Sequence, residues 1–129
     1  MVDPQIVREW LKKADEDIDF AISVINDSVF YAQICFHFHQ GAEKYLKCFI
    51  IAHNLEFKKI HDLPVLLKSC ISKESGLKIL MDDCKFLNAF YLDTRYPVHW
   101  PTQYTKEEAL KAMKAAGHIR DQIRKRLEV

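Results

Sequence analysis

A stripe of polar side chains on one predicted helix contains residue types that could bind a ligand. On a helical wheel at about 100° per residue, part of the helix predicted over Val29–Asn54 gathers its polar residues within an arc of about 80°. The stripe consists of Gln33, His37, Gln40, Lys44 and Lys47. His39 and Glu43 lie outside it, and Glu43 can pair with Lys47 four residues on. The stripe is either the one solvated side of a buried helix or a surface that binds phosphate.

Polar residues on two further predicted helices point toward the core. Asp17 lies at the border of the apolar arc of the first helix, and Asn88 shares the direction of the apolar residues of the fourth. Arg95 follows Asn88 if that helix continues by a turn or two. Polar groups aimed at a core are costly unless they are paired, and the polar stripe could supply the partners. The sequence therefore predicts either a buried ion-pair network that fixes helix register or a site that binds phosphate.

The segment after Arg95 is rich in aromatic and imidazole side chains. It contains Tyr96, His99, Trp100 and Tyr104, together with Pro97 and Pro101. This makeup is typical of platforms on which bases stack, and equally of apolar subunit interfaces.

The elements that must position these residues are helices. Three glycines and four prolines leave little material for the turns of a β-sandwich. Apolar residues recur at three- and four-residue steps. The sequence predicts an all-α, up-and-down bundle of four main helices and one short helix. The helices span Asp3 to Ile25, Val29 to Asn54, a short stretch from His61-Asp62 that ends before a turn over Ser72 to Gly76, Leu77 to Leu92, and a last helix from the capping box at Thr105. The prolines between Asp93 and Tyr104 rule out one continuous helix there.

Length, charge and cysteines limit the classes of function. The 129 residues suit a single domain over 1–129, and a formal net charge of +1 excludes a strongly basic nucleic-acid coat. The four cysteines form no Cys-x-x-Cys pair and lie within apolar patterns, as buried reduced thiols do. With no signal peptide or membrane-spanning run, we expect a cytoplasmic protein that contacts no membrane. No motif indicates a metal or a cofactor.

Several motifs together resemble a known family. Residues 35–47 read CFHFHQGAEKYLK, and Trp10-x-x-x-Ala14-x-x-Asp17 precedes them. His61-Asp62-Leu63 and the DTRYP segment at 93–97 follow in order, then Thr105-x-Glu107-Glu108-Ala109. This combination resembles HEPN domains (higher eukaryotes and prokaryotes nucleotide-binding). The resemblance implies a helical bundle that usually forms homodimers in the prokaryotic cytoplasm. It also implies a possible partner, a minimal nucleotidyltransferase, in a toxin–antitoxin-like pair.

The resemblance also implies activities. Many HEPN domains are metal-independent ribonucleases that use an arginine and a following histidine, and the matching pair here is Arg95 and His99. Three residues separate them, fewer than in the family motif, so nucleotide or RNA binding carries over better than catalysis.

The leading hypothesis is a homodimeric module that binds nucleotide or RNA phosphate. Its candidate ligand-binding residues are Asp17, Gln40, Lys44, Lys47, Asn88, Arg95 and Tyr96. The alternatives are an endoribonuclease that uses Arg95 and His99, and a structural or regulatory interaction domain without a ligand.

Overall fold

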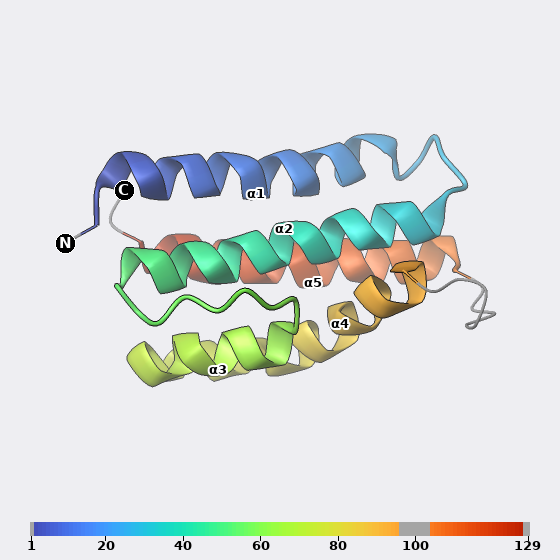
Figure 1. Cartoon of the computed structure of the whole chain (residues 1–129). Helices are drawn as coiled ribbons and strands as arrows, with labels where there is room; N and C mark the ends of the chain where they lie inside the picture. Colours follow the sequence, from blue (N-terminus) through green and yellow to red (C-terminus); the bar gives the residue numbers. More distant parts are fainter. Residues whose placement is uncertain (1, 96–103, 128–129) are drawn as a thin grey trace.

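The chain folds into a bundle of α-helices, as the sequence predicts (Figure 1). The computed structural model describes residues 2–95 and 104–127, with side chains described as far as Tyr91 in the first of these segments. Neither segment contains a β-strand. The elements are α1 (Pro4–Val24), α2 (Tyr31–Ala52), α3 (Leu63–Lys73), the 3-10 helix η1 (Ser75–Leu80), α4 (Met81–Arg95) and α5 (Lys106–Lys125).

Local chemistry at the helix starts sets three of these boundaries. The carboxylate of Asp3 accepts a hydrogen bond from the Gln5 amide (2.9 Å) at the start of α1. Asp62 accepts from the Val65 amide (3.1 Å) at the start of α3. Each bond satisfies an amide that has no partner within the helix. At the start of α5, the hydroxyl of Thr105 and the carboxylate of Glu108 bond reciprocally to backbone amides, which confirms the predicted capping box.

Helix α2 is the central element of the bundle. It contacts α1, α3, α4 and α5, and in Figure 1 α1 lies along one side of it while α3 and α4 lie on the opposite side. The segment 53–62 returns beneath α2, so α3 begins beside the middle of that helix (Figure 1). The core side chains of α2 include Ile34, Phe38, Ala42, Tyr45, Leu46, Phe49 and Ile50.

Several helix boundaries differ from the prediction, two of them informatively. Helix α2 begins at Tyr31 rather than Val29, and both Val29 and Phe30 are exposed. Helix α4 follows a 3-10 turn and continues to Arg95, three residues beyond the predicted end at Leu92. Outside a helix, a proline restricts most strongly the residue directly before it. Pro97 therefore leaves residues up to Arg95 free to be helical.

All four cysteines are buried and free, as predicted. Burial raises the pKa of the Cys35 thiol to about 12, and it does the same for Cys48 and Cys70. Thiols with such pKa values stay protonated and are poor nucleophiles or metal ligands. Within the described residues, no helix combines the length and the hydrophobicity that crossing a bilayer requires.

Candidate functional site

The polar stripe of α2 pairs with α1 through Asp17. Lys44 Nζ donates to Asp17 Oδ2 (2.5 Å), and His37 Nδ1 donates to Asp17 Oδ1 (3.0 Å). The side chain of Asp17 is only 15% exposed, whereas that of Lys44 is 32% exposed. This contact confirms that the inward carboxylate takes its partners from the stripe.

A second polar cluster surrounds Glu43, on another side of α2. Glu43 is 4% exposed and Lys47 is 7% exposed. Lys47 Nζ donates to Glu43 Oε2 (2.9 Å), which confirms the expected pairing along the helix. The other oxygen of Glu43 accepts from His61 Nδ1 (3.0 Å), at the start of α3. The buried carboxylate therefore holds a cation from its own helix and an imidazole from the returning segment.

His61 belongs to a group of rings gathered around Tyr91 of α4. The Tyr91 ring stacks with that of His61 (centroids 4.7 Å apart, 19° between planes) and with that of His39 (5.4 Å, 27°). Phe36 stacks with it from further away (6.1 Å, 23°). His61 keeps 48% of its side chain exposed. Tyr91 and His61 thus form a partly exposed surface of stacked rings.

His39 forms the buried side of this ring group. It is fully buried, and its Nδ1 donates to Gln40 Oε1 (3.1 Å). Burial lowers the pKa of His39 because a charged imidazole loses its hydration there. His39 is therefore a neutral ring that packs behind the surface.

Asn88 fixes the start of α3 from α4. Its Oδ1 accepts from the backbone amide of Leu63 (2.9 Å), two residues after His61. The inward amide predicted from the sequence is therefore paired with backbone rather than with the lysines of α2. This bond helps to hold His61 where Glu43 and Tyr91 can reach it.

We expect Asn88→Ala to lower the free energy of unfolding by about 1–2 kcal/mol, because the backbone amide of Leu63 loses its hydrogen-bond acceptor. Asn88→Asp retains an acceptor oxygen and should recover most of that loss. Urea denaturation of both variants is the measurement. Equal stability of Asn88→Ala and wild type would show that the bond contributes nothing.

Part of the predicted site lies outside the described residues. Arg95 is the last residue of α4 and its backbone lies one turn beyond Tyr91. Its side chain, and the whole of Tyr96 and His99, fall outside what the structure describes. The convergence of the Arg95 guanidinium with Lys44 and Lys47 therefore stays a prediction.

The two residues at the centre of the second cluster, Glu43 and His61, were not among the predicted site residues. Only the pairing of Glu43 with Lys47 was predicted, and His61 was noted only as part of the motif that opens the third helix. A signal was present in the His61-Asp62-Leu63 motif, which opens α3 and places an imidazole directly before the helix cap.

A separate network joins α1, α2 and α5. The hydroxyl of Tyr45 donates to the carboxylate of Asp15, and Arg124 Nε donates to the Tyr45 oxygen (3.0 Å). Arg120 Nη1 donates to Asp19 Oδ1 (2.9 Å). Burial raises the pKa of Tyr45, so its hydroxyl remains a donor. This network ties the outer helices together, and it uses two cations of the basic end of α5.

The central helix of this all-helical bundle thus pairs its charged residues with α1 and with the segment before α3. The sequence profile of the HEPN domain matches residues 7–126, and the chain belongs to the HEPN family. This confirms the resemblance inferred from the motifs.

Two solved structures share the fold. The crystal structure of TT1696 from Thermus thermophilus is 28% identical, with a TM-score of 0.84 over 94% of this chain and 98% of that one. The structure of ST0689, described as an archaeal HEPN homologue, is 25% identical, with a TM-score of 0.76 over 93% of this chain and 96% of that one. No curated protein matches the chain significantly.

Proposed function

We propose that this HEPN domain binds a nucleotide or an RNA phosphate at the ring surface of Tyr91 and His61. The observation that supports the proposal is the buried carboxylate of Glu43, 4% exposed, which holds an imidazole that is itself half exposed. Burying a carboxylate is costly, so a purely solvated face has no need of this arrangement. The held imidazole presents a ring and a polar edge to an incoming ligand.

Each part of this surface suits one part of a nucleotide. Aromatic and imidazole rings stack with bases whatever the base sequence. Arg95 follows Tyr91 by one turn of α4, and a guanidinium binds a phosphate through two parallel hydrogen bonds. In the proposed complex, the base packs on Tyr91 and His61, and the phosphate lies toward Arg95 and Tyr96.

In this proposal the other predicted site residues position or neutralise the groups that contact the ligand. Lys44 is the more exposed of the two lysines and contributes positive potential near the ligand, while Asp17 holds it in place. Gln40 orients His39. Lys47 neutralises Glu43, and Asn88 fixes the start of α3.

We also propose that the domain acts as a homodimer, with a minimal nucleotidyltransferase as a candidate partner. Support for both comes from the family alone. Light scattering of the pure protein tests the first, because a monomeric mass at micromolar concentration contradicts it. Co-expression with a neighbouring nucleotidyltransferase gene, followed by purification through one tag, tests the second.

Titration with mononucleotides and short single-stranded RNA tests the binding proposal. We expect Arg95→Ala to weaken binding roughly 10- to 100-fold, since charged hydrogen bonds contribute about 1.5–3 kcal/mol. The matched control is Arg8→Ala, which removes the same charge from an exposed arginine whose Nη2 donates to Gln5 on α1. Equal weakening in both variants would indicate nonspecific attraction, and no binding by the wild type would refute the proposal.

A further inference from the structure

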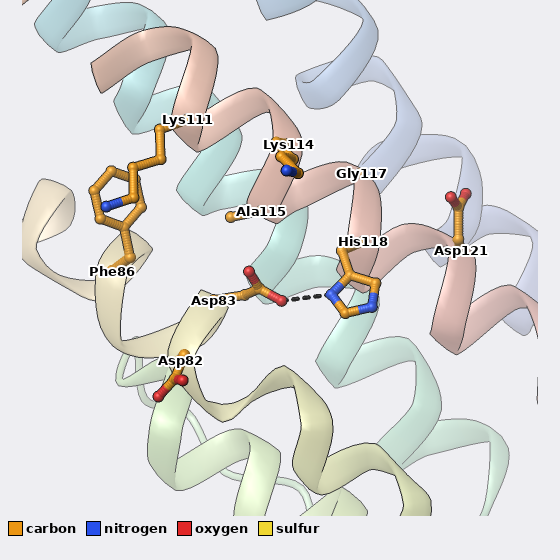
Figure 2. A pocket seen from close by; sticks show the side chains of 9 residues that line it. All are labelled: Asp82, Asp83, Phe86, Lys111, Lys114, Ala115, Gly117, His118 and Asp121. Carbon is orange, nitrogen blue, oxygen red and sulfur yellow. Dashed lines mark hydrogen bonds and ion pairs between the residues drawn. The ribbon is translucent and has the colours of Figure 1, made fainter. Parts of the chain in front are cut away.

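A groove between α4 and α5 lies apart from the Tyr91 surface and carries its own polar groups (Figure 2). Its volume is about 740 Å³. Side chains of Asp82, Asp83 and Phe86 line it from α4, and those of Lys111, Lys114, His118 and Asp121 line it from α5. None of these residues takes part in the proposed nucleotide site.

The centre of this groove is a pair formed by Asp83 and His118. His118 Nδ1 donates to Asp83 Oδ2 at 2.6 Å. The side chain of His118 is 41% exposed and that of Asp83 is 26% exposed. A carboxylate on Nδ1 fixes the tautomer of a neutral imidazole, so Nε2 carries the free lone pair. In Figure 2 the second ring nitrogen of His118 lies on the side of the ring away from Asp83. The pair therefore holds His118 as an oriented nucleophile in the wall of the groove.

Two lysines of α5 line the groove with this nucleophile, and so do the carboxylates of Asp82 and Asp121. Lys114 precedes His118 by one helical turn and Lys111 by two, so all three lie on the same side of α5. Lys111 Nζ lies 4.5 Å from the centroid of the Phe86 ring. Among the described residues, no atom outside the adjoining part of α5 lies within 4 Å of the position that a Cβ on Gly117 would occupy. A mid-helix glycine costs about 1 kcal/mol relative to alanine, and no packing within the described residues requires it here.

We propose that His118 Nε2 is a phosphoacceptor that takes a phosphoryl group from an activated donor of the phosphoramidate or acyl phosphate class. The Nε2 lone pair attacks phosphorus, and an N–P bond forms as the bond from phosphorus to the leaving group breaks. That group departs with the electron pair, as ammonia from an N-protonated phosphoramidate or as a carboxylate from an acyl phosphate. The ring gains positive charge in this step, which the Asp83 carboxylate stabilises. Lys114, one helical turn before His118 in the same groove, supplies positive potential for the transferred phosphoryl oxygens.

The test uses the full chain and phosphoramidate as donor. Phosphohistidine is followed by ³¹P NMR and located by mass spectrometry under alkaline conditions, where it survives. His61 is an internal control, because a carboxylate also holds its Nδ1 and its side chain is 48% exposed. We expect His118 to be modified faster than His61, and His118→Gln to abolish that signal.

Two further variants separate the proposed chemistry from simple exposure. Asp83→Asn should slow modification of His118 roughly tenfold or more, since its neutral amide stabilises the ring charge less. Lys114→Met should also slow it, while circular dichroism confirms that both variants remain folded. Modification of His118 no faster than that of His61, or at an unchanged rate in Asp83→Asn, would reduce the pair to a structural contact and overturn the proposal.

Discussion

Replacing Glu43 with alanine should lower the free energy of unfolding by about 3–5 kcal/mol, because it leaves a buried ammonium without its counter-ion. Lys47 is 7% exposed, and its Nζ donates to Glu43 Oε2 at 2.9 Å. The same replacement removes the oxygen that holds His61. Guanidinium chloride denaturation measures the loss. We expect the variant to bind nucleotide more weakly as well, since the imidazole of His61 is no longer oriented.

The control for this prediction replaces both charges. Glu43→Met combined with Lys47→Met removes the pair without stranding either member, and such exchanges are often close to neutral. We therefore expect the double variant to be more stable than Glu43→Ala. If Glu43→Ala alone were as stable as wild type, Lys47 would have to reach solvent, and the cluster would not be the fixed support that the proposed site requires.

Sequence alone could predict the features of this fold that local chemistry determines. The caps at Asp62 and Thr105 are visible as residue types at fixed spacing, and their side chains make the expected bonds. The pairing of Asp17 with Lys44 follows from helical periodicity on two amphipathic helices. In each case the position of a residue along its helix sets the direction in which its side chain points, and that direction determines which group it can bond to.

The contact between Glu43 and His61 could not be predicted in this way. It depends on the path of the segment 53–62, which turns back beneath α2 after Asn54 takes up a left-handed conformation (φ 57°). The amides of Asn54 and Leu55 bond to the carbonyls of Ile51 and Ile50, which satisfies the end of α2. Helical periodicity carries no information about such a return, so it predicts the pairing of Glu43 with Lys47 but not the contact of Glu43 with His61.

The close approach of α1 and α2 leads to the second large prediction. A Cβ added to Gly41 would collide with Ile18 Cγ1, and it would lie 3.0 Å from Ile18 Cδ1 and 3.1 Å from the carbonyl oxygen of Ala14. Two of these three atoms belong to a fully buried side chain and the third to backbone. We expect Gly41→Ala to destabilise the fold by about 1–3 kcal/mol, the usual cost of overpacking a core.

The matched control is Gly117→Ala on α5, where, among the described residues, no atom outside the adjoining part of the helix lies within 4 Å of the added Cβ. Both glycines are helical, so alanine brings the same gain in helix propensity, up to about 1 kcal/mol. Gly117→Ala should therefore be neutral or stabilising, and the difference between the two variants measures the steric cost at the α1–α2 contact alone. Thermal denaturation of both proteins under one set of conditions gives that difference. If both variants showed the same rise in melting temperature, α1 would move away from α2 without cost, and the α1–α2 contact would not depend on a glycine at position 41.

A shift of α1 in Gly41→Ala would also carry Asp17 away from Lys44 and His37. Because Lys44 contributes to the proposed site, we expect this variant to bind nucleotide more weakly.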